Sequence, residues 1–329
     1  MARVFSGIQP TGDLHIGNYV GALRQWVSLV REYDCIYSVV DYHAITVEYQ
    51  PAEMAERTLN TAIILLACGL DPEACRIQVQ SHVPQHTELG WIFNSVTPVG
   101  DAERMTQFKE KSKQHRGNIN MGIMDYPVLQ AADILIYKAR FVPVGEDQVQ
   151  HVELCREIAR KFNARFGDVF PEPEAILSCA PRILGTEGKS KMSKTLNNYI
   201  GILEDEGSIW EKLRTAVTDV ARVRRTDPGD PEVCNIYTMH RAFSPEDAQK
   251  ELGEACKSAA VGCIECKRVL LKNMMAELNP IREKALSLKE HPDYVVDALK
   301  QGAEACRRMT EETMDEVQKA LGLFRLPHP

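Results

Sequence analysis

The sequence predicts an α/β protein in which a parallel sheet, covered by helices on both faces, is followed by a helical domain. In the first half, short β-branched and aromatic runs alternate with longer stretches of helical periodicity, as in strand–helix–strand units. After Pro181 this alternation ends, and from residue 204 to 321 the periodicity is almost wholly helical. We therefore expect a Rossmann-type, doubly wound parallel sheet with a C-terminal helical domain.

The predicted elements of the first half follow one another as strand and helix. The predicted strands are short apolar runs, at residues 4–8, 35–40, 76–80 and 141–144. The predicted helices carry apolar residues three and four positions apart, at residues 16–31, 54–68, 86–95, 103–113, 128–137 and 147–166.

Two breaks divide the rest of the chain. One is the Asp-Pro-Gly-Asp-Pro segment at 227–231, and the other is His291-Pro292. We predict a catalytic domain at 1–185, a helical domain at 186–291 and a last helix within 292–329 that could pack back on the sheet. Proline is well suited to the first turn of a helix, which favours a helix starting at 292.

Bulk properties restrict the class of protein. The chain has 329 residues and a formal net charge of −7, which argues against indiscriminate coating of nucleic acid. Basic residues nevertheless cluster at 109–116, 222–225 and 267–272, either as solvated helix faces or as local RNA contacts. No apolar run is long enough to span a membrane, and the N-terminal segment lacks the layout of a signal peptide. We expect no membrane partner and a cytoplasmic location.

A candidate phosphate site follows the first predicted strand. The turn Gln9-Pro10-Thr11-Gly12 leads to His15-Ile16-Gly17-Asn18 at the start of a predicted helix. Free backbone N–H groups and the positive end of the helix dipole attract phosphate there. His15 and Asn18 lie one turn apart and could add side-chain donors. The segment could equally be an ordinary strand–turn–helix connection.

A lysine-rich loop provides a second candidate. Residues 188–195 read Gly-Lys-Ser-Lys-Met-Ser-Lys-Thr, so cations alternate with glycine and small hydroxyl residues. The composition suits a mobile loop that binds oxyanions, although a solvated basic loop has the same composition.

These two segments resemble the signature elements of class I aminoacyl-tRNA synthetases. His15-Ile16-Gly17-Asn18 is similar to the HIGH element, and residues 191–195 (KMSKT) are similar to the KMSKS loop. Further stretches resemble the bacterial tryptophanyl-tRNA synthetases, namely DYHAIT at 41–46, YPVLQAADILIY at 126–137 and VPVGEDQVQHVEL at 142–154. Asn18 and Thr195 depart from the class motifs. The resemblance covers almost the whole chain.

The resemblance implies that tryptophan is activated by ATP to tryptophanyl-adenylate, with release of pyrophosphate, and is then transferred to tRNA(Trp). It assigns the chemistry to His15, Asn18, Lys111, Lys191 and Lys194. It implies ATP contacts at Gln9, Pro10, Thr11, Gly17, Asn18, Gly145, Glu146, Asp147, Ile183, Lys191, Met192, Ser193, Lys194 and Thr195. Mg²⁺ is expected with the ATP.

The same resemblance implies an apolar slot for the amino acid with a polar end. Its residues would be Phe5, Val40, His43, Tyr126, Asp133, Val142, Val144 and Gln148. Asp133 would accept the indole N–H, while Tyr126 and Gln148 would hold the amino group. Judged by composition alone, Asp133 could instead be a buried ion-pair partner and His43 a core histidine.

Four of the ten cysteines are spaced C-x21-C-x6-C-x2-C, at Cys234, Cys256, Cys263 and Cys266. This pattern is typical of a metal centre. Because only one Cys-x-x-Cys pair is present, it favours a 4Fe-4S iron–sulfur cluster over zinc, which usually takes two pairs. Some tryptophanyl enzymes carry a cluster motif that is one residue longer in its first gap. Four unrelated cysteines are the remaining alternative.

The resemblance also implies a homodimer. Two competing functions remain at this stage. A tyrosyl-tRNA synthetase would share class, fold and chemistry, and a non-catalytic RNA-binding or iron–sulfur paralogue would share the fold alone. We expect metal loss to affect tRNA charging more than adenylate formation, because the adenylate residues lie in the other predicted domain.

Overall fold

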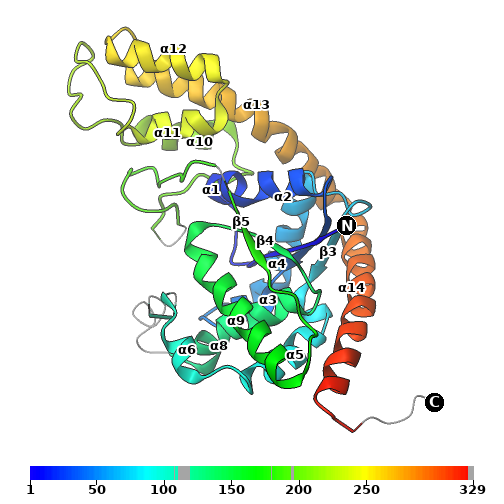
Figure 1. Cartoon of the computed structure of the whole chain (residues 1–329). Helices are drawn as coiled ribbons and strands as arrows, with labels where there is room; N and C mark the ends of the chain where they lie inside the picture. The colour runs from blue at the N-terminus through cyan, green and yellow to red at the C-terminus, as the bar shows by residue number, and fades with distance from the viewer. Residues whose placement is uncertain (107, 110–118, 179, 194–195, 325–329) are drawn as a thin grey trace.

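The computed structural model describes residues 1–106, 108–109, 119–178, 180–193 and 196–324. A parallel five-stranded sheet lies in the first half of the chain, with strand order β3-β2-β1-β4-β5 (Figure 1). The strands are β1 Arg3–Ile8, β2 Asp34–Val39, β3 Arg76–Val79, β4 Phe141–Val144 and β5 Glu174–Leu177. The predicted fold class is confirmed.

The centre of the sheet is buried because helices cover it. In β2 every residue after Asp34 is buried, and β1 has three consecutive buried residues. Such runs are expected for parallel strands that are covered on both faces. The sequence analysis missed β5, which has four residues and contains no fully buried side chain.

Between β1 and β5 the chain forms α1 Ile16–Asn18, the π-helical turn η1 Tyr19–Leu23, α2 Arg24–Leu29, α3 Asp41–Ala44, α4 Pro51–Ala67, the 3₁₀ turn η2 Gln80–His82, α5 Gln85–Asn94, α6 Val99–Glu103, α8 Met121–Leu135, the 3₁₀ turn η3 Glu146–Gln148 and α9 Val149–Phe166. The first three form one continuous helical segment where residues 16–31 were predicted.

One helix begins earlier than predicted, and another cannot be compared over most of its length. Helix α8 begins at Met121 instead of 128, because Asn120 caps it by accepting a hydrogen bond from Ile123 N at 3.1 Å. Pro127 is accommodated inside this helix, although proline cannot donate a backbone hydrogen bond there. Much of the helix predicted at 103–113 lies outside the described residues.

The second half is helical, with α10 Glu206–Thr215, α11 Asn235–Phe243, α12 Glu246–Lys257, α13 Cys263–Glu290 and α14 Pro292–Ala320. Helix α13 connects the two parts of the molecule (Figure 1). Its Glu277 accepts hydrogen bonds from Tyr19 at 2.6 Å and Arg24 at 2.8 Å, both on the helical segment that follows β1.

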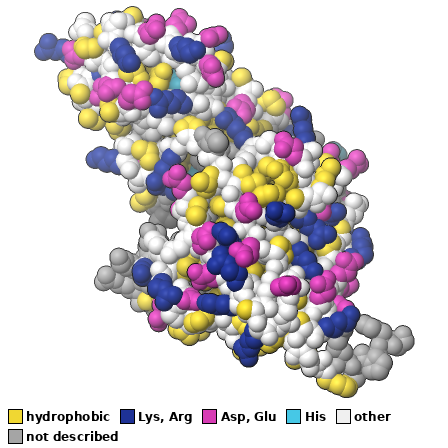
Figure 2. Space-filling model, in the orientation of Figure 1, with side chains coloured by type: hydrophobic (Ala, Val, Ile, Leu, Met, Phe, Trp, Pro, Cys, Tyr) yellow, Lys and Arg dark blue, Asp and Glu magenta, His cyan; other side chains and the backbone are white. Residues whose placement is uncertain are grey.

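Helix α14 lies along the edge strand β3 (Figure 1). A Cβ atom on Gly302 would come within 2.0 Å of the Ile77 carbonyl oxygen, so only glycine permits this approach. Among the described residues, no helix is both long and apolar enough to cross a membrane. On the face seen in Figure 2, basic and acidic side chains are interspersed over both halves of the molecule.

Candidate active site

A cavity of about 240 Å³ opens where the strand order of the sheet reverses. The chain builds β1, β2 and β3 outward in one direction and then places β4 on the other side of β1. Ligands of open α/β sheets bind at such a switch point, beyond the carboxyl ends of the strands. The cavity is lined from β1, β4, α3 and α8, which meet there.

All eight residues predicted for the amino-acid slot line this one cavity. They are Phe5, Val40, His43, Tyr126, Asp133, Val142, Val144 and Gln148. Gln9 and Gly145, which were predicted for ATP, line it as well. The cavity therefore combines apolar walls with a few polar groups, as small-molecule sites usually do. The individual roles of these residues stay predictions.

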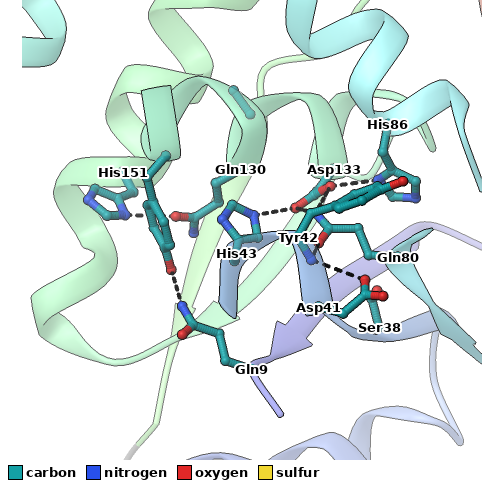
Figure 3. A network of polar contacts seen from close by, with 12 residues as sticks. Gln9, Ser38, Asp41, Tyr42, His43, Gln80, His86, Gln130, Asp133 and His151 are labelled. Carbon is teal, nitrogen blue, oxygen red and sulfur yellow. Dashed lines mark hydrogen bonds and ion pairs between the residues drawn. The ribbon is translucent and has the colours of Figure 1, made fainter. Parts of the chain in front are cut away.

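Asp133 is the centre of a buried polar network (Figure 3). His43 Nε2 lies 2.7 Å from one carboxylate oxygen, and His86 Nδ1 lies 2.6 Å from the other. Gln80 Nε2 donates to both oxygens at 2.8 and 2.9 Å. Only 1% of Asp133 is exposed. These contacts come from α3, α5 and η2, so the carboxylate also joins three elements of the fold.

The network keeps Asp133 ionised. Burial raises the pKa of a carboxyl group, but the hydrogen bonds and charges of His43 and His86 outweigh it and lower the pKa of Asp133 to about 2. Both sequence interpretations of Asp133 are thus relevant, because it lines the cavity and is also held by histidines. A carboxylate has about four lone-pair sites, and the four contacts from three donors use them all, because Gln80 Nε2 is shared between the two oxygens. A bound N–H donor would replace one of the two Gln80 contacts.

A second set of polar groups surrounds Tyr126, and three of them, Gln9, His43 and His151, are labelled in Figure 3. Gln9 Nε2 donates to the Tyr126 hydroxyl at 3.1 Å, and the Tyr126 ring lies 4.3 Å from that of His43. Burial raises the pKa of Tyr126 to about 12, so its hydroxyl stays protonated. His151 Nδ1 lies 2.7 Å from Gln130 Oε1.

Sequence reasoning missed several residues of this site, among them three with polar side chains. Gln130 lines the cavity, and its position one helical turn before Asp133 could have indicated this. Gln80 and His86 contact Asp133 from separate elements, and no motif in the sequence connects them to it.

The predicted phosphate site has the expected local structure. His15 is the N-cap of α1, its Nδ1 accepts from Asn18 N at 3.3 Å, and Asn18 Oδ1 accepts from His15 N at 3.1 Å. This reciprocal capping fixes both side chains at the helix start. A Cβ on Gly17 would lie 2.9 Å from His15 Nδ1, so glycine is needed for the arrangement.

The lysine loop lies against this helix start. Leu184 and Lys191 form an antiparallel bridge, and the buried Met192 lies 3.8 Å from the position that a Gly17 Cβ would occupy. The structure thus brings the two predicted phosphate elements together. Lys191 Nζ lies 3.9 Å from Asp147 Oδ2, and both side chains are exposed, so this pair contributes little to stability.

The remaining ATP candidates lie in the segments that border this region. Pro10 and Thr11 connect β1 to α1, Glu146 belongs to η3 directly after β4, and Ser193 follows Met192. Ile183 is buried in the same apolar cluster as Met192. Lys111, Lys194 and Thr195 lie outside the described residues.

The four cysteines come together in the helical region although they lie on three elements. Cys234 caps α11, Cys256 lies in the last turn of α12, and Cys263 and Cys266 lie in the first turn of α13. Burial, and after it the charges of the other three thiols, raise the pKa of Cys266 to about 12. None of the four is in a disulfide. Because each of the other three thiols affects the pKa of Cys266, the four thiols lie near one another.

Other polar groups border the thiols. Arg222 Nη1 lies 3.7 Å from Cys256 Sγ, and His240 Nε2 lies 3.3 Å from Cys266 Sγ. Within the described parts of the chain, no three His, Cys, Asp or Glu side chains lie close enough together to hold a single metal ion.

Comparison with known proteins was made on the whole chain. The family model described as tRNA synthetases class I (W and Y) matches residues 1–279. The tryptophan–tRNA ligase of Deinococcus radiodurans is 52% identical over 99% of this chain and 100% of its own. That of Thermotoga maritima is 47% identical over 98% of this chain and 99% of its own.

A solved structure gives the same result for the fold. The tryptophanyl-tRNA synthetase of Campylobacter jejuni, solved in complex with ADP and tryptophan, superposes with a TM-score of 0.87 and 36% identity. The match covers 98% of this chain and 100% of that chain.

Proposed function

We propose how the residues of this chain perform its reaction, starting from its family. The chain belongs to the class I tRNA synthetases for tryptophan and tyrosine, and within them to the tryptophan–tRNA ligases. Such an enzyme binds tryptophan, ATP and tRNA(Trp). The observation that carries the assignment of roles is the cavity at the switch point, whose apolar walls surround an ionised carboxylate.

Tryptophan occupies this cavity. The indole ring packs between Phe5, Val142 and the other apolar walls. Its N–H donates to Asp133 in place of one of the two contacts that Gln80 Nε2 makes with the carboxylate. The Tyr126 hydroxyl and Gln148 bind the amino group. His43 Nδ1 is buried and has no hydrogen-bond partner among the described residues, so the bound amino acid could also satisfy this nitrogen.

Discrimination against other amino acids follows from the polar groups. A site built to bind a substrate N–H rejects an analogue that lacks it by roughly 10⁴–10⁵, because its own group stays unpaired. Phenylalanine offers no N–H to Asp133.

ATP lies across the start of α1, next to the cavity. His15 and Asn18 face the phosphates, with Gln9, Pro10, Thr11 and Gly17 beside them. Gly145, Glu146, Asp147 and Ile183 border the adenosine. The tryptophan carboxylate attacks the α-phosphate, and the bond to the pyrophosphate breaks. A terminal ribose hydroxyl of the tRNA then attacks the carbonyl of the adenylate, the bond between the carbonyl carbon and the phosphate oxygen breaks, and AMP leaves.

The lysine loop neutralises the departing pyrophosphate. Lys191 and Lys194, with Lys111, supply positive charge, while Met192, Ser193 and Thr195 shape the loop. Positioning of the reactants and electrostatic stabilisation of the transition state account for most of the rate enhancement in reactions at phosphate. Mg²⁺ accompanies the ATP, and it screens charge on the phosphates when bound.

The four thiols fit an iron–sulfur centre. We propose that Cys234, Cys256, Cys263 and Cys266 each give one thiolate to a 4Fe-4S cluster. The support for this proposal is the spacing of the four cysteines in the sequence and their placement on α11, α12 and α13, which pack together. Zinc is the alternative. The cluster, when bound, supplies covalent cross-links between α11, α12 and α13, whereas Arg222 provides a nearby positive charge.

The chain divides into a catalytic domain at 1–185, a helical anticodon-binding domain at 186–291 and the C-terminal segment 292–329.

Homodimer formation would cover exposed apolar side chains on α5, on α6 and at or just before the start of α8, namely Trp91, Val99, Ile119 and Met121. Light scattering of Trp91→Glu, with the unaltered protein beside it, tests this surface.

The decisive assay is ATP–pyrophosphate exchange with tryptophan and, separately, with tyrosine. Exchange that depends on tryptophan and not on tyrosine supports the proposed site. Exchange with tyrosine alone would exclude the assigned specificity, and exchange with neither would favour a non-catalytic paralogue.

A further inference from the structure

A buried side chain of the helical region is bonded to the base of the lysine loop. Gly185 and Gly188 close a turn there, with Gly188 N donating to Gly185 O at 2.8 Å. The same carbonyl accepts a buried hydrogen bond from Asn235 Nδ2 at 2.8 Å. Asn235 is 6% exposed and is the first residue of α11, directly after Cys234.

A second buried side chain reaches the same turn indirectly. Lys267 Nζ donates to the carbonyls of Arg214 at 3.0 Å and Ala216 at 2.6 Å, at the C-terminal end of α10. The next residue, Val217, donates its N–H to Thr186 O at 2.8 Å. Lys267 is 4% exposed and directly follows Cys266. A cation is favoured at this end of a helix dipole.

The turn also packs on these two supports. Gly188 has a φ of 71°, and a Cβ there would lie 3.6 Å from Asn235 Cβ and 3.7 Å from Val217 Cβ. The hairpin continues with Gly185 N bonded to Ser190 O at 2.8 Å and with the bridge between Leu184 and Lys191. A shift of the turn would therefore be transmitted to Lys191.

We propose that Asn235 and Lys267 are positioning residues that hold the lysine loop in register with the phosphate site from the helical domain. The inference rests on the proposed role of this loop in pyrophosphate departure. It revises the expectation that adenylate formation is insulated from the cysteine region, because each support is adjacent in sequence to one of the four thiols. Disturbance of the thiols would then reach the loop through two hydrogen-bonded side chains.

The test compares two asparagines of the same domain. Asn235→Ala removes the bond to the loop, whereas Asn273→Ala removes a bond of equal length, 2.8 Å to Ser244 Oγ, that stays within the helical domain. Three measurements are made on the full-length protein: thermal unfolding, tryptic cleavage after Lys189 and Lys191 without substrates, and the kinetics of tryptophan-dependent pyrophosphate exchange.

We expect Asn235→Ala to speed cleavage of the loop several-fold and to lower kcat for exchange roughly three- to tenfold, the rate equivalent of one neutral hydrogen bond. Tryptophan affinity should not change, since Asn235 is not part of the cavity wall. Asn273→Ala should leave cleavage and kcat unchanged at a similar loss of thermal stability.

Equal cleavage and equal kcat in the two variants would overturn the proposal. If Asn235→Ala does not fold, Lys267→Met gives the same comparison, because it keeps the apolar stem and removes the second support. Failure of the unaltered protein to catalyse exchange would count against the proposed function, while the cleavage comparison would still decide whether these side chains hold the loop.

Discussion

Replacement of Asp133 by alanine should damage both tryptophan activation and stability. The carboxylate accepts hydrogen bonds from His43, His86 and Gln80 at 2.6–2.9 Å. Alanine would leave these donors without their acceptor at a buried position. Removing one partner of a buried ion pair typically costs about 3–5 kcal/mol, a large part of the roughly 5–15 kcal/mol by which a domain is stable.

The kinetic effect follows from the lost substrate contact. A hydrogen bond to a charged group contributes on the order of 1.5–3 kcal/mol, so kcat/KM for tryptophan should fall at least tenfold. ATP affinity without tryptophan should change little. The assay is pyrophosphate exchange at a temperature where the variant is fully folded by circular dichroism.

A matched control separates substrate recognition from stability. Asp101 is also buried and ionised, and it is paired with Lys161 and Arg104 outside the cavity. Asp101→Ala should therefore reduce the free energy of unfolding and leave kcat/KM for tryptophan unchanged. If Asp133→Ala kept its kcat/KM, Asp133 would be a structural ion-pair partner only, and our assignment of the indole contact would be refuted.

The pKa of Asp133 adds a pH dependence with a definite sign. The folded value is lowered from 3.8 to about 2, so the carboxylate contributes stability above its unfolded pKa and loses it as pH falls towards 2. Linkage puts this contribution at about 2 kcal/mol near neutral pH, and it should decline below about pH 5. In Asp133→Ala the acid-induced loss of stability should be smaller by that amount, as urea titrations at several pH values would show.

Three other predictions concern the loop, the thiols and the last helix. Lys191→Ala should lower kcat of adenylate formation about 10²–10³-fold and leave the affinity for tryptophan unchanged. Lys189→Ala is the control in the same loop and should not cause this loss of kcat. A loss of tryptophan binding in Lys191→Ala would mean that the loop acts on the amino acid and not on the pyrophosphate. Protein purified without oxygen should be brown, with about four iron and four sulfide per chain; Cys263→Ser should remove the colour, and Cys68→Ser should not. Colourless protein with stoichiometric zinc would show that the site binds zinc. Colourless, metal-free protein would show that the four cysteines bind no metal. Gly302→Ala should lower the free energy of unfolding by roughly 1–3 kcal/mol or more in urea titrations, since its Cβ would meet the Ile77 carbonyl oxygen at 2.0 Å. The control is Gly100→Ala, whose Cβ would have no atom nearer than 3.6 Å and which should not destabilise the protein. Equal effects of the two substitutions would show that α14 can move away from β3 at no cost.

Much of the fold could be predicted from the sequence because its signals are local. Apolar runs such as Cys35-Ile36-Tyr37 and long helical periodicities depend only on neighbouring residues, and they indicated the parallel sheet and the helical half. Strand β5 escaped because four half-exposed residues carry no such pattern. The eight residues of the amino-acid slot were predicted from the family resemblance instead, and all eight line one cavity.

Only the tertiary structure decided which residues complete the site. Gln80 and His86 reach Asp133 from η2 and α5, and their contact depends on how β3 and α5 pack against α8. In the same way, Asn235 bonds to Gly185, fifty residues earlier in the chain. Pairings between distant residues leave no periodic trace in one sequence, because each partner is an ordinary polar residue until packing removes water and makes its hydrogen bond necessary.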